Sequence, residues 1–196
     1  MLENKNRNNS SVKSSANKSH MKFYYPFFLI AIIMLIASCK DKAGDTTFNI
    51  DVTAEVTLPA THGIELPVDA DSEWEETEST SIFESENTEA GLLTSASLKN
   101  LQLVLKTPVG GNFNYLDEIS VFINAAGLPE IKVANNLDAE TGVGILNFEE
   151  LDVDVLEYVK SNTIQFRVNY SSDDYESEDH DCEIYSVFEV SGTTLN

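Results

Sequence analysis

The segment Phe48-Asn-Ile-Asp-Val-Thr-Ala-Glu-Val-Thr-Leu58 decides the fold class of this chain, because apolar and polar residues alternate along it without interruption. A period of two places every second side chain on the same side of an extended backbone. One face of the segment is therefore buried and the other is solvated. Pro59 follows directly and ends the strand, since proline has no backbone N–H to donate.

Further segments with strand character follow, separated by turn residues. They cover residues 78–86, 96–107, 119–123, 129–134, 144–148, 163–170 and 182–190. Only two segments suit short helical turns, one after Asn112 and one within residues 152–160. About seven or eight strands with one or two helical turns predict an all-β fold, a single antiparallel β-sandwich.

The N-terminal region has the parts of a secretory signal. Met21-Lys22 precede an apolar run of 15 residues, 23–37, which is shorter than the roughly 20 residues of a membrane-spanning helix. The tetrapeptide Ile36-Ala37-Ser38-Cys39 resembles the lipobox of bacterial lipoproteins. That resemblance implies attachment of a diacylglycerol to the Cys39 thiol, cleavage just before Cys39 and, often, acylation of its new amine; palmitate is an example of the acyl chains. A transmembrane anchor is the alternative, and translation from Met1 or from Met21 stays open.

These features divide the chain into three parts. Residues 1–38 are an N-terminal extension and signal peptide, residues 39–47 are a lipidated tether, and residues 48–196 are the β-sandwich domain. We expect the mature protein to attach to the membrane through the lipid on Cys39.

A second resemblance concerns the mature part. The segment Leu93-Thr-Ser-Ala-Ser-Leu-Lys-Asn-Leu-Gln-Leu, continuing through Thr107-Pro108 and Leu128-Pro-Glu-Ile131, is similar to a group of Bacteroidetes-type lipoproteins. These lipoproteins have β-sandwich domains without an assigned biochemical role. Lys40-Asp41 resembles the start of their export signal. The resemblance implies residence in the outer membrane with exposure at the cell surface, and it transfers no active site.

The chain is strongly acidic, with 12 Lys and Arg residues, 33 Asp and Glu residues and a net charge of −21. Five basic residues and one acidic residue precede Cys39, so residues 40–196 carry 7 basic and 32 acidic side chains and a net charge of −25. Such a surface repels phosphate backbones, which excludes nucleic acid as a partner. The simplest role of this charge is to keep the protein soluble.

The chain contains two cysteines, Cys39 and Cys182. If Cys39 carries lipid, Cys182 has no partner for a disulfide within the chain. Cys182 shares an alternating face with Phe188, so we expect it to be an inert residue of the core.

The acidic run between the last two strands is the candidate metal site. Its carboxylates could hold Ca²⁺, which favours oxygen ligands in flexible geometry. The run lacks the glycine and the spacing of a helix-flanked calcium loop, and a solvated hairpin tip is the favoured alternative. The candidate ligands are Asp173, Asp174, Glu176, Glu178, Asp179 and Asp181. No other cofactor is expected.

Trp74 is the candidate ligand-binding residue, because it lies among acidic residues outside the alternating segments. An exposed indole can stack on a sugar. A place in the core is the favoured alternative, since a lone tryptophan is more often a core residue than a platform. No nucleophile elbow or phosphate loop occurs, so we predict no catalytic residue. The leading hypothesis is a non-enzymatic interaction or accessory module of the cell envelope with a protein or glycan partner. A surface glycan-binding lipoprotein is the alternative, and a hydrolase is the third hypothesis.

Overall fold

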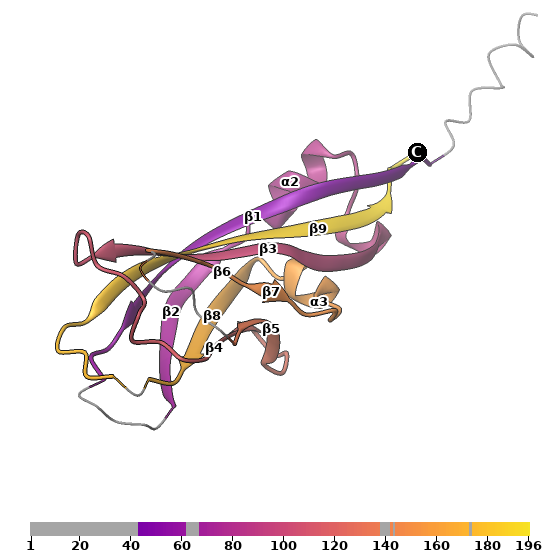
Figure 1. Cartoon of the computed structure of the whole chain (residues 1–196). Coiled ribbons are helices and arrows are strands. Elements are labelled where there is room, and N and C mark those ends of the chain that lie inside the picture. The colour runs from indigo at the N-terminus through magenta and orange to yellow at the C-terminus, as the bar shows by residue number, and fades with distance from the viewer. Residues whose placement is uncertain (1–42, 62–66, 138–141, 143, 173) are drawn as a thin grey trace, which may run out of the picture. The chain divides into compact units, whose positions relative to one another are not determined.

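Two antiparallel sheets form the part of the chain that the computed structural model describes, namely residues 43–61, 67–137, 142, 144–172 and 174–196 (Figure 1). The first, sheet A, has the strand order β1-β9-β3-β6, and the second, sheet B, has the order β2-β8-β4-β5-β7. This arrangement confirms the predicted all-β sandwich.

The strands are long in sheet A and shorter in sheet B. Sheet A contains β1 (Asp45–Leu58), β3 (Leu93–Thr107), β6 (Ile145–Asn147) and β9 (His180–Thr193). Sheet B contains β2 (Val68–Glu76), β4 (Ile119–Ala125), β5 (Ile131–Asn136), β7 (Glu149–Glu150) and β8 (Thr163–Tyr170). The helical elements are α2 (Ser79–Ser85), η1 (Ala90–Leu92) and α3 (Leu156–Val159).

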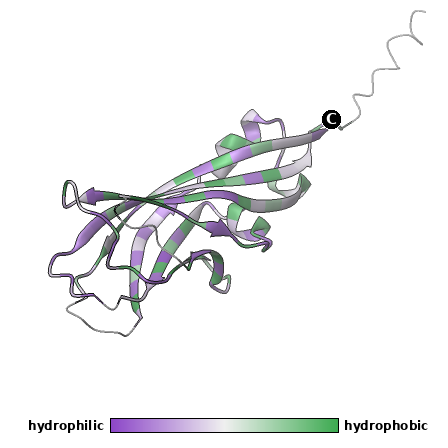
Figure 2. Cartoon of the chain, in the orientation of Figure 1, coloured by the Kyte–Doolittle hydropathy of each residue, from purple (hydrophilic) through white to green (hydrophobic). Residues whose placement is uncertain are grey.

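The core lies between the two sheets and is built from alternate residues of each strand. Figure 2 shows hydrophilic and hydrophobic residues alternating along the strands. Ile50 in β1, Leu103 in β3 and Phe166 in β8 are fully buried. Along β9 every second residue from Cys182 to Val190 is buried, as the sequence predicts. The period-two pattern therefore sets both the strands and the face that each one buries.

The predicted strand through residues 78–86 is wrong, because Ser79–Ser85 form helix α2. Ile82 and Phe83 are consecutive, so a strand would send them to opposite faces. In the helix Phe83 is buried and Ile82 packs against the core. The Phe83 ring meets Phe48 edge-on with 6.1 Å between ring centroids. The buried Ser79 hydroxyl donates to the backbone oxygen of Val159 at 2.6 Å, which fixes the start of the helix.

Two smaller features also differ from the prediction. The segment after Asn112 makes a turn and no helix: the Leu116 N–H bonds to the Phe113 oxygen, and Asn112 Oδ1 accepts from the Asn114 N–H at 3.0 Å. The sequence also missed β2, because its residues do not alternate throughout. The helical turn expected within 152–160 is confirmed as α3.

The first and last residues of the fold lie together, and Figure 1 shows the C-terminus beside the start of β1. The Gly44 N–H donates to Thr194 Oγ1 at 2.9 Å, and the Thr194 N–H donates to the Gly44 oxygen at 2.9 Å. Cys39 and the signal segment lie outside the described residues, as do residues 40–42 of the tether. Within the described ranges, no helix has the length and apolar character needed to cross a membrane.

Candidate functional site

Trp74 lies in the edge strand β2, directly opposite Gln165 of β8. Residues paired across two strands share a face of the sheet. The neighbours of Gln165 along β8, Ile164 and Phe166, are buried in the core. Gln165 and Trp74 therefore belong to the outer face of sheet B. Trp74 is 47% exposed, so it lies at the surface and not in the core, the place that the sequence favoured for a lone tryptophan.

A β-bulge turns Trp74 outward. Ala70 and Ser72 are both buried, and strict alternation would place Trp74 on the same inner side. The register between β2 and β8 shifts between Asp71 and Trp74, so that Ser72 and Glu73 together oppose Phe166. One extra residue in a strand moves all following side chains to the other face. The bulge thus brings Trp74 to the surface.

Ser72 holds the bulge in place through three hydrogen bonds. Its hydroxyl accepts from the Phe166 N–H at 3.0 Å and donates to the Glu73 oxygen at 2.7 Å. Its backbone oxygen accepts from Gln165 Nε2 at 2.8 Å. The serine side chain therefore replaces the backbone acceptor that Phe166 loses where the ladder is interrupted.

The bulge has a cost in stability. About half of the Trp74 surface stays in contact with water. Burying that surface in the core would stabilise the fold by roughly 2–3 kcal/mol. Glu75 takes the inner side instead, opposite the buried Ile164. Burial raises the pKa of Glu75 above its ordinary value, and the nearby carboxylates of Glu55 and Glu73 raise it further. Departures from local folding rules that cost stability are typical of functional sites.

Polar side chains continue the Trp74 surface across the sheet. Gln165 is paired on its other side with Asn124 of β4, so Trp74, Gln165 and Asn124 form one row across three strands. Sequence reasoning missed Gln165 and Asn124. Each occupies an outward position of a strand, but their proximity to Trp74 depends on strand order and on the bulge.

A charged cluster lies beside this row. Arg167 donates to both carboxylate oxygens of Glu130, at 2.9 and 2.6 Å, and also to Asp69 Oδ1. Its guanidinium lies 4.0 Å from the centre of the Phe122 ring. Hydrogen bonding to Glu130 raises the pKa of Arg167, so the side chain stays charged. The Arg167 cluster therefore ties β2 and β8 to Glu130, the residue directly before β5, on the outer face.

The acidic run does not converge on one point in the described residues. Asp179 Oδ1 accepts from the Ala60 N–H at 2.8 Å. Glu176 Oε1 accepts from the N–H groups of Ser177 and Glu178 in its own loop, at 3.0 and 3.4 Å. Asp174 uses its backbone oxygen to accept from Thr61 and Ser172.

Asp181 is directed to a third place, the outer face of sheet A. Its carboxylate accepts from Thr57 at 2.8 Å and from Thr107 at 2.9 Å, and these hydrogen bonds lower its pKa. The carboxylates of Glu176, Asp179 and Asp181 thus have separate partners. No group of three or more His, Cys, Asp or Glu side chains suits a metal ion in the described ranges. Asp173 lies outside these ranges, so calcium binding stays a hypothesis.

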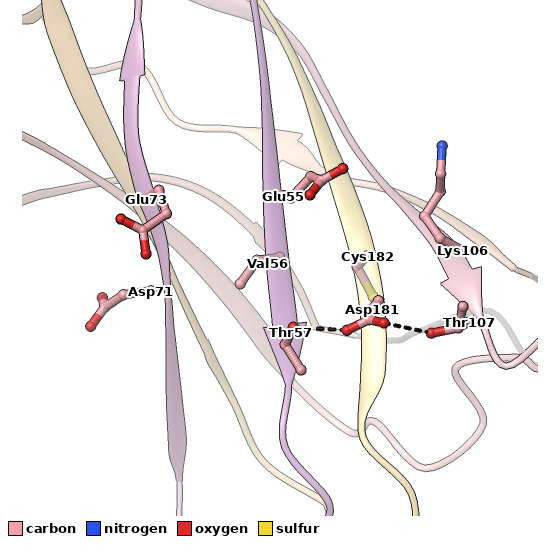
Figure 3. Close-up of a pocket in the computed structure, with 9 residues that line it drawn as sticks. All are labelled: Glu55, Val56, Thr57, Asp71, Glu73, Lys106, Thr107, Asp181 and Cys182. Atoms are coloured by element: carbon pink, nitrogen blue, oxygen red, sulfur yellow. Dashed lines mark hydrogen bonds between the residues drawn. The ribbon is translucent and has the colours of Figure 1, made fainter.

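A pocket of about 540 Å³ lies where the edges of β1 and β2 face one another (Figure 3). Figure 3 shows Asp181 between Thr57 and Thr107. Its walls come from β1, β2, β3 and β9, and the lining residues are Glu55, Val56, Thr57, Asp71, Glu73, Lys106, Thr107, Asp181 and Cys182. Lys106 pairs with Glu183 at 2.6 Å. The pocket is therefore an acidic recess suited to attracting cations.

Cys182 is buried, with 2% of its surface exposed, which confirms the predicted place in the core. Burial, together with a smaller effect of the Asp181 carboxylate, raises the pKa of its thiol to about 12. A thiol with so high a pKa is a poor nucleophile. The neighbouring His180 is also buried and its ring lies 4.7 Å from that of Tyr115. This aromatic packing closes the end of the core near the acidic run.

Comparisons with known proteins identify no family for this chain. No protein-family model matches it, and no curated protein matches it. Among solved structures, it is similar to a chain from Desmodium yellow mottle tymovirus at 10% sequence identity, with 100% of this chain and 98% of that chain covered and a TM-score of 0.24. A likeness at this TM-score carries no argument about function.

Proposed function

We propose that this chain is a lipid-anchored, non-enzymatic binding protein of the cell envelope. The binding surface is the outer face of sheet B around Trp74. The observation that carries the binding role is the bulge at Ser72 and Glu73, which exposes Trp74 and turns Glu75 inward. Local arrangements that reduce stability are typical of functional sites, which supports a binding role for the exposed Trp74 indole.

The anchor rests on the lipobox-like Ile36-Ala37-Ser38-Cys39. The short separation of Cys39 from the fold along the sequence supports this role. Gly44 is hydrogen-bonded to Thr194 and β1 begins at Asp45, so the fold starts five residues after Cys39. Five residues span at most about 18 Å. A lipid on Cys39 would therefore hold the domain close to the bilayer without lying inside its core.

The non-enzymatic assignment is supported by the groups in the acidic pocket. Asp181 accepts two threonine hydrogen bonds that favour its ionised form, which suits a structural acceptor rather than a general acid. The Cys182 thiol is buried and has a raised pKa, which does not suit a nucleophile. Asp181 and Cys182 thus have structural roles in the pocket.

The anchor is tested by a Cys39→Ala variant expressed in a bacterium that processes lipoproteins. Wild-type protein is expected to incorporate labelled palmitate and to fractionate with the outer membrane. The Cys39→Ala variant is expected to lose the label and to leave the membrane fraction after processing. The Cys182→Ala variant is the matched control, since it removes the other cysteine and leaves the lipobox intact. Membrane retention of Cys39→Ala would contradict the anchor.

The side of the membrane is tested separately by protease treatment of intact cells. The resemblance of Lys40-Asp41 to a surface-export signal predicts that the domain is digested in intact cells. An internal marker protein in the same cells must remain undigested. Digestion only after the outer membrane has been opened would place the domain on the inner side and limit its partners to periplasmic molecules.

A further inference from the structure

The Trp74 row, defined as Trp74, Gln165 and Asn124, combines an exposed indole with two amides, and we infer that it binds a neutral polysaccharide. This inference rests on the proposed binding role and names the chemical class of the partner. The three residues lie side by side on β2, β8 and β4 by strand pairing. The row is thus built by three strands of one sheet and does not depend on a loop.

The chemistry of the row matches that of a sugar. The apolar faces of a pyranose ring stack on a flat aromatic surface, and the Trp74 indole is 47% exposed. Sugar hydroxyls both donate and accept hydrogen bonds, and so do amide side chains. Gln165 Nε2 is held by the Ser72 oxygen at 2.8 Å, which orients the amide. The half-buried Asn124 amide makes no hydrogen bond to another residue in the described ranges and so can face a ligand.

The dimensions of the row favour a polymer over a single small sugar. Neighbouring strands are about 4.8 Å apart, so the row from β2 to β4 extends about 10 Å across the sheet. None of its three residues lines the pocket of Figure 3. A small ligand needs an enclosing cleft to bury most of its surface. A chain of sugars can instead lie across a flat face and contact the indole with one ring and the amides with another.

The charge of the surface selects a neutral polymer. The three residues of the row are uncharged, although residues 40–196 carry a net charge of −25. Arg167, two residues from Gln165 on β8, is held by Glu130 and Asp69. An anionic polymer is repelled by the acidic domain, and a cationic polymer finds no free carboxylate within the row.

A protein partner fits this surface less well. Stable protein interfaces bury about 1,200–2,000 Å² and have an apolar centre. Here a single indole is flanked by amides, and the Phe122 ring is covered by the Arg167 guanidinium at 4.0 Å. With Phe122 covered, the apolar surface exposed here is that of the Trp74 indole.

The test uses the full chain in detergent, run by electrophoresis through gels that contain amylopectin, xyloglucan or galactomannan as neutral probes. We expect retardation by at least one of them, unchanged in 0.5 M added salt (about a 4–5 Å screening length) because the contacts are uncharged. Trp74 is the only tryptophan of the chain, so the same polymer should shift its fluorescence emission directly.

Three variants assign the effect to the row. Trp74→Ala is expected to weaken binding about tenfold or more, as for a central aromatic contact, and Trp74→Phe to retain an intermediate affinity. Asn124→Ala is expected to weaken binding less than Trp74→Ala. Tyr185→Ala is the matched control, because Tyr185 is an exposed aromatic residue of β9 in the other sheet. Thermal melts of all variants confirm that they fold.

The inference is overturned if no neutral polymer retards the wild-type protein, or if folded Trp74→Ala is retarded equally. Retardation by cationic chitosan alone, abolished by salt, would reflect the acidic surface and would also overturn it. Glycan binding and lipid attachment are measured separately. Binding by a Cys39→Ala protein therefore supports this inference even where labelling contradicts the anchor.

Discussion

The hydroxyl of Ser72 accepts the Phe166 N–H at 3.0 Å, at the point where β2 contains one residue more than β8 opposite it. This contact connects a local irregularity to the proposed binding surface. Because of the bulge, Ser72 lies on the inner side of the sheet, whereas Trp74, two residues later, lies on the outer face. A single buried serine thus stabilises the register on which the exposure of Trp74 depends.

Replacement of Ser72 by Ala is expected to lower the free energy of unfolding by about 1–3 kcal/mol, because the buried Phe166 N–H loses its acceptor. Urea denaturation measures this loss. The Trp74 emission spectrum of the native variant should also change, since the bulge relaxes. Ser95→Ala in β3 is the control, because Ser95 is exposed. An unchanged stability and spectrum would show that the bulge does not depend on the hydroxyl.

Arg167→Lys is expected to destabilise the protein by about 1–2 kcal/mol. Lysine cannot reproduce the paired hydrogen bonds to Glu130 or the flat contact with Phe122. The Arg167 side chain is only 21% exposed, so solvent screens these contacts incompletely. The exposed pair Lys99–Glu189 provides the comparison, since Lys99→Ala should change stability by less than about 0.5 kcal/mol. Equal effects at the two sites would contradict the role given to Arg167.

The Cys182 thiol is expected to resist modification by a disulfide reagent at pH 8 in the folded protein and to react fully in denaturant. Its pKa is raised to about 12 by burial, whereas the thiol of the unfolded chain ionises near its ordinary value of 9.0. Above that value the unfolded chain binds fewer protons than the folded chain, so the free energy of unfolding decreases as pH rises. The contribution is complete below pH 9 and is lost as pH approaches 12. Cys182→Ala should flatten this decline in urea titrations between pH 8 and 11, and rapid labelling of native protein would contradict the buried position.

Calcium is expected to leave the melting temperature unchanged. Two carboxylates of the acidic run are held by separate partners, Asp179 by the Ala60 N–H and Asp181 by Thr57 and Thr107. A ligand at a thousand times its Kd stabilises a fold by about 4 kcal/mol, which corresponds to a shift of roughly 8–16 °C for a domain of this size. Melts in EDTA and in millimolar CaCl₂ distinguish the two cases. A shift that Asp174→Asn abolishes would establish the calcium site that the sequence left open.

The strands that could be predicted from the sequence are those whose side chains alternate strictly. β8 has the predicted bounds, and β1 and β9 contain the predicted segments with the predicted faces buried. The strand expected at residues 78–86 failed because adjacent apolar residues there, Ile82 and Phe83, suit a helix that turns both toward the core. The acidic run was recognised as a loop, but Asp179 and Asp181 take their partners from segments far away in the sequence, Ala60 for Asp179 and Thr57 and Thr107 for Asp181.

The sequence by itself determined the sandwich, the acidic surface and the burial of Cys182, because alternation and charge are properties of neighbouring residues. Only the tertiary structure decided the face of Trp74. By position in the strand Trp74 belongs with Ala70 and Ser72, which are buried. The register against β8 overrides that position through one extra residue, and register is a property of two strands that lie 93 residues apart at the Ser72–Gln165 contact.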